Sequence, residues 1–296
     1  PDWRRLYERR EPYKTNILPQ KACVLTGGID VQKDRLEVQL LAWAKGKESW
    51  SIDYRVFPGD TSDLSASGPW ANVTKLLQET WQREDGATFG LRLVAIDSGY
   101  NTQVVYDFVR RYPSNRVIAT KGQDSMQMLV GSPSAVDVFS NGKRVRRGLK
   151  VWSIGASMAK SELYGLLRLD KPTEQELAEH GYPPGFAHFP EYGEDFFRQL
   201  TAEQLTKKLI KGFTKFEWEK VYERNEALDT WILCRVAAAI VGIDRFTPEQ
   251  WQEMQGISTA IQTKEEIKGA QSAANPGETV DRVGPRSIPR KKSSFW

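Results

Sequence analysis

Three aspartates stand where predicted buried elements begin or end, and carboxylates in such places could hold divalent metal ions. Asp30 closes the apolar segment CVLTGGID, and Asp97 closes the apolar part of LRLVAIDSG. Asp229 lies near the start of a strongly apolar helix predicted over 225–243. Converging carboxylates repel one another, and divalent cations relieve that repulsion. Two ions held in this way would activate water for in-line attack on a phosphodiester.

Each aspartate also has an ordinary structural explanation. Aspartate is common in turns, so DVQKDR after the first apolar segment could be a polar loop. An acid in the first turn of a helix is favoured by the helix dipole, which would explain Asp229. The pattern alone leaves both interpretations open.

The composition narrows the kind of metal site. The chain has two histidines, two cysteines and no CxxC pair, so a structural zinc site has no basis, and a metal would be bound by oxygen. Cys23 and Cys234 lie in apolar stretches and are expected to be buried free thiols. His188 is expected to be a structural histidine. No apolar stretch of 18 or more residues indicates a membrane span.

The elements that would position the aspartates form an α/β pattern. Short connections predict antiparallel pairing of the first three strands. If the first and fourth strands are parallel neighbours, Asp30 and Asp97 lie side by side at the carboxyl edge of the sheet. Asn101 is placed to cap the helix that follows the fourth strand. The predicted elements are strands at 23–30, 35–43 and 49–57, a helix at 70–82, a strand at 91–99, a helix at 101–112 and a strand at 116–122.

The second half of the chain predicts a β-hairpin and then helices. Residues 136–155 read as a hairpin in which Asn141-Gly142 supplies the turn. Beyond it come a helix at 157–169, short helical patches mixed with turns over 173–205, a strand at 213–221 and the helix at 225–243.

Basic residues are concentrated in the predicted hairpin. The net charge is +4, but residues 264–296 hold seven Lys or Arg and four Asp or Glu, so the remainder is nearly neutral. Overall charge is therefore no argument for nucleic-acid binding. The hairpin supplies a local argument, because a basic two-stranded ribbon can follow a phosphate backbone; contact with a protein is the alternative. Its basic residues are Lys143, Arg144, Arg146, Arg147 and Lys150.

Six blocks of the sequence resemble the nuclease half of bacteriophage terminase large subunits of the lambda-type GpA family. They occur in order across about 20–243: GGIDVQKDRLEVQLLAW, VAIDSGYNTQVVYDFVR, VIATKG, IGASMAKSELYGLL, HFPEYGEDFFRQLTAEQL and WEKVYERNEALDTWILCRVAAAI. The resemblance implies a ribonuclease-H-like mixed sheet, with three antiparallel strands followed by parallel strands, flanking helices and a β-hairpin insertion. It also implies an endonuclease that uses two Mg²⁺ or Mn²⁺ ions to cut concatemeric double-stranded DNA.

The resemblance assigns roles to individual positions. Asp30, Asp97 and Asp229 match the family's first, second and third acidic positions. Glu226 is either an outer metal ligand or only a helix N-terminal acid. Two lysines, Lys121 and Lys160, could contact phosphate or orient a carboxylate, or could simply be solvated.

The resemblance also implies an organisation and a set of partners. Residues 1–20 would be a linker from an absent ATPase domain, 21–262 the nuclease domain, and 263–296 a basic, disordered tail that docks on the portal. The start at Pro1 also suggests a fragment, and no GxxxxGK[ST] phosphate loop is present. The expected partners are viral DNA, the terminase small subunit and the portal protein, in the host cytoplasm.

Two other function classes stay open at this point. One is a DNA-binding or portal-docking module without catalysis. The other is a different ribonuclease-H-like enzyme, such as a transposase or resolvase.

Overall fold

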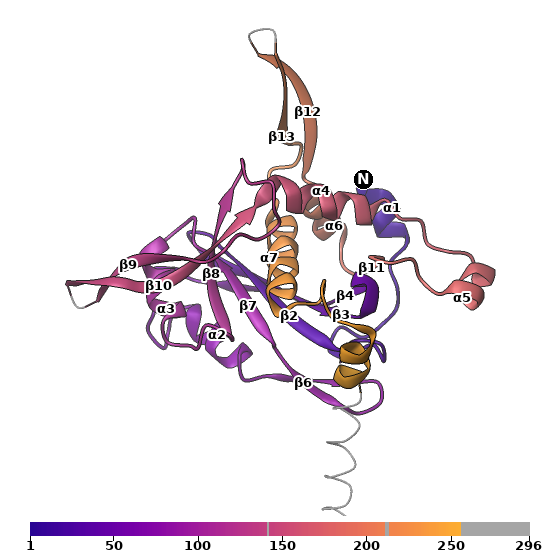
Figure 1. Cartoon of the computed structure of the whole chain (residues 1–296), viewed down its shortest axis with the longest axis horizontal. Helices are drawn as coiled ribbons and strands as arrows, with labels where there is room; N and C mark the ends of the chain where they lie inside the picture. The colour runs from indigo at the N-terminus through magenta and orange to yellow at the C-terminus, as the bar shows by residue number, and fades with distance from the viewer. Residues whose placement is uncertain (141, 211–212, 256–296) are drawn as a thin grey trace, which may run out of the picture.

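The computed structural model describes residues 1–140, 142–210 and 213–255, and its centre is a mixed β-sheet (Figure 1). The strand order of the sheet is β11-β4-β3-β2-β7-β8-β10-β9. These strands are β2 (Val24–Val31), β3 (Arg35–Trp43), β4 (Ser49–Pro58), β7 (Leu93–Asp97), β8 (Val117–Gln123), β9 (Ser134–Ser140), β10 (Lys143–Gly155) and β11 (Ala187–His188).

The pairing directions confirm the expected pattern of antiparallel and then parallel strands. The pairs β2–β3 and β3–β4 are antiparallel, whereas β2–β7, β7–β8 and β8–β10 are parallel. β9 and β10 form the expected hairpin. Of its expected turn, Asn141 lies outside the described residues, and Gly142 has a φ of 72°.

Smaller strands and the helices complete the fold. The remaining strands are β1 (Ile17–Leu18), β5 (Thr80–Arg83), β6 (Thr88–Gly90), β12 (Glu203–Ile210) and β13 (Phe213–Lys220), and a 3-10 turn covers Lys45–Lys47. The helices are α1 (Trp3–Glu8), α2 (Trp70–Leu76), α3 (Thr102–Val109), α4 (Ala156–Leu167), α5 (Glu174–His180), α6 (Glu194–Leu200) and α7 (Glu226–Val241).

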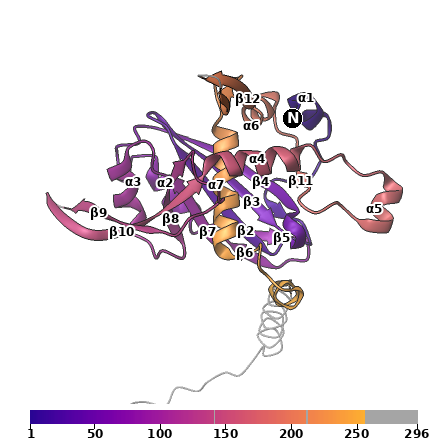
Figure 2. The same cartoon turned by 45° about the horizontal axis from the view of Figure 1, so that its top comes forward.

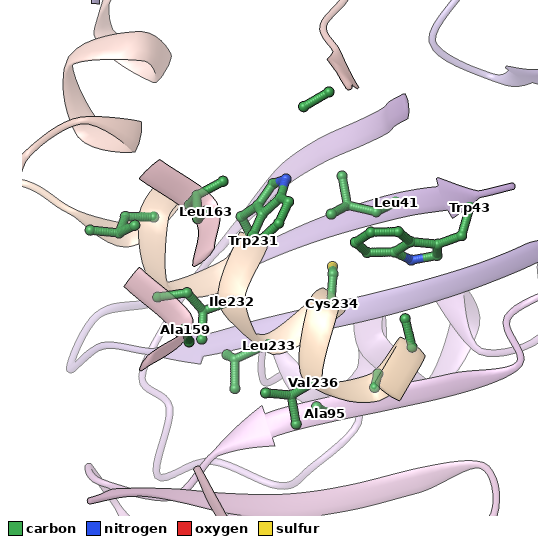
Figure 3. Close-up of a cluster of buried hydrophobic side chains, with 14 of the residues drawn as sticks. Leu41, Trp43, Ala95, Ala159, Leu163, Trp231, Ile232, Leu233, Cys234 and Val236 are labelled. Carbon is green, nitrogen blue, oxygen red and sulfur yellow. The ribbon is translucent and has the colours of Figure 1, made fainter. Parts of the chain in front are cut away.

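Helices cover both faces of the sheet, which explains why β2 is buried along its whole length. On one face α7 lies across β2, β3 and β7, with α4 and α6 beside it. Figure 3 shows Trp231 and Cys234 of α7 against Leu41 and Trp43 of β3. On the other face α2 and α3 pack together, and the rings of Trp70 and Phe108 lie 4.6 Å apart.

Glycine at position 28 determines how closely α7 approaches the sheet. A Cβ atom there would lie 2.2 Å from the carbonyl oxygen of Thr230 and 2.8 Å from the nitrogen of Cys234. Only a residue without a side chain allows this contact. Thr26 of the same strand donates a hydrogen bond to the carbonyl of Cys234 at 2.9 Å, which fixes the helix against β2.

Several boundaries differ from the sequence prediction. The helix predicted over 70–82 ends at Leu76, because Trp81 alternates with exposed neighbours in strand β5. Asn101 occupies the N-cap position of α3, but its side chain donates to the hydroxyl of Thr61 and does not cap the helix. Strand β12 was not predicted, and it pairs with the predicted strand at 213–221.

Residues before β2 lie against this body. Leu6 of α1 is buried in the core with α6. His188 is hydrogen-bonded through Nδ1 to the carboxylate of Glu11, at 2.8 Å, and through Nε2 to that of Glu48, at 3.2 Å. Its ring stacks on Trp50. His188 is therefore a buried structural residue, as expected. The two cysteines are buried free thiols, as expected. The tail from 263 onward lies outside the described residues.

Candidate metal and DNA site

The three aspartates converge in one pocket. Asp30, Asp97 and Asp229 line a hollow of about 170 Å³ together with Lys160. Its remaining walls are Gly122, Ile154, Ala156, Ile232 and Leu233. The three aspartates therefore line one hollow from β2, β7 and α7, three elements that are far apart in the sequence.

The sheet register brings Asp30 and Asp97 to the same edge. Ile29 of β2 pairs with Ile96 of β7 in a parallel ladder, and the next residue of each strand is an aspartate, Asp30 or Asp97. Parallel neighbours end at the same edge of a sheet, where open α/β folds bind their ligands. The close approach of α7 to Gly28 then brings the first turn of that helix, with Asp229, to this edge.

Hydrogen bonds hold one oxygen of each carboxylate. The side-chain amide of Gln32 donates to Asp30 Oδ2 at 2.6 Å. The backbone N–H of Gly99 donates to Asp97 Oδ2 at 3.0 Å. The side-chain amide of Asn225 donates to Asp229 Oδ2 at 2.9 Å. The chain therefore orients all three groups before any ligand is bound.

Burial makes negative charge costly in this pocket. Burial and, to a smaller extent, the nearby charge of Asp30 together raise the pKa of Asp229 to about 8, against the opposing charge of Lys160. Burial raises the pKa of Asp30 to about 6, against the hydrogen bond from Gln32, with a smaller contribution from Asp97. Burial also raises the pKa of Asp97, against hydrogen bonds from Gly99 and Ser98.

These properties fit a hard divalent cation. A bound cation would remove the mutual repulsion of the acids, and carboxylate oxygens are the ligands that Mg²⁺ and Mn²⁺ prefer. In the described part of the chain, no three His, Cys, Asp or Glu side chains already stand close enough together to hold a metal ion. The match therefore lies in the shared pocket and the donor chemistry.

Lys160 is part of this site and is not a solvated lysine. Its ammonium donates to Glu203 Oε2 at 2.6 Å, and the side chains of both residues are largely buried. Asn225 donates to Glu203 as well as to Asp229, at 3.0 and 2.9 Å. A continuous network thus joins Lys160 to the third aspartate. Sequence reasoning missed Glu203 and Asn225.

Lys121 and Glu226 lie beside the pocket and do not line it. Lys121 is exposed on β8, and its charge lowers the pKa of Asp97, although burial dominates. Glu226 is buried and forms ion pairs with Arg35 and Arg224. Its part in metal binding stays a prediction.

A buried ion cluster behind Glu226 was also missed. Glu37 is fully buried and accepts from Arg35 Nε at 2.6 Å, and it also pairs with Arg224 and Tyr54. A sequence signal existed, because Glu37 lies between Leu36 and Val38 in a strand that is mostly apolar. Paired and hydrogen-bonded charges of this kind tolerate burial.

The basic hairpin carries all five of its predicted cations on the surface. Lys143, Arg144, Arg146, Arg147 and Lys150 are exposed. Arg144 pairs with Asp137 of β9, whose other oxygen accepts the backbone N–H of Arg147 at 2.8 Å. Within the described ranges, the side chains of the other four basic residues form no ion pair. β10 runs from this hairpin to the pocket, where Ile154 forms part of the wall.

No helix within the described residues is long and apolar enough to cross a membrane.

Comparisons with known proteins match most of the chain to one family of phage proteins. A family model described as "Terminase large subunit gpA, endonuclease domain" matches residues 1–251. The terminase large subunit of Escherichia phage lambda is 31% identical over 251 residues, which cover 83% of this chain and 36% of that protein. The terminase large subunit of Enterobacteria phage P21 is 28% identical over 241 residues, covering 80% and 35%. The chain therefore spans about a third of the length of these relatives.

Proposed function

Since the chain belongs to the family of terminase large subunit gpA endonuclease domains, we propose that it is a metal-dependent endonuclease that cuts concatemeric viral double-stranded DNA. The observation that carries this proposal is the convergence of Asp30, Asp97 and Asp229 in one pocket. Three independent turn or cap aspartates would have no reason to meet there.

Asp30, Asp97 and Asp229 would hold two Mg²⁺ or Mn²⁺ ions. Bound ions would supply an activated water and would stabilise negative charge on the phosphate. The chain's own contribution is orientation, because Gln32, Gly99 and Asn225 each fix one carboxylate. Lys160 brings a positive charge to the wall of the same pocket, where a phosphate oxygen would be attracted.

The fold proposed for this activity is of the ribonuclease-H type. The supporting observation is the order of three antiparallel strands followed by parallel β7 and β8, with acids at the ends of β2 and β7. The hairpin of β9 and β10 would be the insertion that binds duplex DNA, with Lys121 near the scissile phosphate.

The wider assembly follows from the family and from length. The match covers only 36% of the lambda relative, which leaves room in such a protein for an ATPase part of the same polypeptide. We infer that the DNA is delivered by that part, and that the terminase small subunit and the portal protein are partners. Residues 1–20 would connect to the ATPase, 21–262 form the nuclease, and 263–296 contact the portal.

Cleavage of supercoiled plasmid tests the proposal. The chain should nick or linearise plasmid in Mn²⁺ or Mg²⁺ and should be inactive in chelator. Asp97→Asn should abolish cleavage, whereas Asp170→Asn should not, because Asp170 is an exposed carboxylate paired with Arg5. A chain that binds plasmid but never cuts it in either metal would instead be a DNA-binding module. Joining of strands as well as cutting would indicate a transposase.

A further inference from the structure

The hairpin of β12 and β13 projects from the body in a different direction from the basic hairpin of β9 and β10 (Figures 1 and 2). Its described residues include the three most exposed large apolar side chains in the described part of the chain. Leu209, Phe213 and Phe216 have exposed fractions of 75%, 79% and 61%. A two-stranded hairpin that stands away from the core gains no stability from apolar side chains that face solvent.

The strand register sorts these residues onto two faces. Residues directly opposite in an antiparallel pair share a face. Leu205 opposes Trp218, Lys207 opposes Phe216, and Leu209 opposes Thr214. We call this side, with Leu205, Lys207, Leu209 and Phe216, the apolar face.

The opposite face carries ion pairs along most of its length, with Phe213 at its outer end. Lys208 contacts Glu217 and Glu219 at 3.1 and 2.7 Å, and Lys215 contacts Glu217 at 2.7 Å. The two described outer acids of the hairpin are thus neutralised on this side. The outer part of the apolar face carries one charge, Lys207, which forms no ion pair in the described part of the chain.

The root of the apolar face joins the acid pocket. Trp218 donates to the hydroxyl of Ser157 at 3.0 Å, and its ring lies 5.9 Å from the ammonium of Lys160. Glu203, the first residue of β12, holds Lys160, and Asn225 links Glu203 to Asp229. The apolar face therefore starts at residues that also build the pocket.

We infer that the apolar face is a second DNA-contact surface, which places Leu209 and Phe216 against sugars and base edges in a groove next to the cut site. Groove-binding proteins pair apolar side chains with basic residues in this way. A protein interface fits less well, because lysine is depleted from the centres of such interfaces, and Lys207 stands at the centre of this one. The inference rests on the proposed nuclease function.

Duplex binding in chelator, measured with the whole chain at several salt concentrations, tests the inference. Leu209→Ser with Phe216→Ser should weaken binding about tenfold, because the partial burial of two large apolar side chains is lost. The salt slope should stay unchanged, because no cation is removed. Phe213→Ser is the control, since it removes a phenylalanine from the opposite face that is more exposed than Phe216. It should bind within about twofold of the parent, and all variants should keep the parent melting temperature.

Three outcomes would overturn the inference. Unchanged binding by the double variant would remove the apolar face from the DNA path. An equal loss in Phe213→Ser would show a general effect of the hairpin tip. Concentration-dependent self-association of the parent that the double variant abolishes, with DNA binding intact, would make the face a contact between copies. A parent that binds DNA through this face but never cleaves it contradicts only the nuclease proposal.

Discussion

Asp30, Asp97 and Asp229 differ from ordinary surface aspartates because their folded environment opposes their charge. Burial raises the pKa of all three, most strongly for Asp229. A fold that keeps such groups together loses stability for them unless a ligand restores it. Removing one charge should therefore separate stability from activity.

Replacement of Asp30 or Asp229 by Asn should abolish cleavage without lowering the melting temperature of the metal-free protein. The amide keeps the shape of the side chain and removes a buried charge, so stability should be equal or higher, by on the order of 1 kcal/mol. Plasmid cleavage and thermal unfolding in chelator measure the two effects. A variant that loses activity only because it unfolds would contradict the role assigned to that carboxylate.

His188 should make stability depend on pH away from the acid pocket. Burial lowers its pKa, but hydrogen bonds to Glu11 and Glu48 outweigh burial and raise the pKa above 6.5. The protonated form is thus favoured in the folded state. Its stabilisation is fully present below pH 6.5 and is lost as the pH rises through the higher folded pKa. The melting temperature should fall over that window, and His188→Gln should flatten the profile. A parent profile with no such fall would contradict this.

At the scale of elements, the contact between α7 and β2 aligns the third acid with the first. Gly28→Ala would place a methyl group 2.2 Å from the carbonyl oxygen of Thr230, so the helix must move. Overpacking of this kind costs about 1–3 kcal/mol, and Asp229 would move with the helix. We expect a lower melting temperature and a larger fall in cleavage than unfolding explains. Gly90→Ala is the control, because no atom lies within 4 Å of its Cβ position.

The basic hairpin should govern affinity and leave the chemistry unchanged. Each lysine or arginine that neutralises a phosphate changes the slope of log affinity against log salt by roughly 0.9. Changing Arg144, Arg146 and Arg147 to Ala should flatten that slope, and cleavage at limiting DNA should fall more than cleavage at saturating DNA. A control that replaces the exposed Lys14, Lys45 and Lys171 by Ala removes the same charge elsewhere. Equal slopes in the two triple variants would show that the hairpin faces a protein or solvent.

Across the whole molecule, the sequence predicted what depends on neighbouring residues and missed what depends on distant ones. The ends of β2 and β7 follow from continuous apolar runs, so Asp30 and Asp97 were placed correctly at one sheet edge. The pairing of Arg35 with Glu226 joins residues 191 positions apart, and no local pattern reveals it. Strand β12 was missed because its lysines conceal an alternation that only its pairing with β13 makes visible. Asp229 was singled out by its place near the start of the last predicted helix, but its approach to Asp30 depends on Gly28, which contacts that helix about 200 residues later in the chain.

Cleavage and portal binding should depend on different parts of the chain. The acid pocket and both hairpins lie before residue 255, and the family match ends at residue 251. A chain that ends at residue 262 should therefore keep the parent melting temperature and the parent rate of plasmid cleavage. It should bind the portal protein more weakly, because the removed segment ends in the basic and aromatic sequence RKKSSFW. Portal pull-down and plasmid cleavage, measured on both chains, test the two halves separately. Loss of cleavage on naked plasmid would show that the segment after 262 serves the nuclease itself.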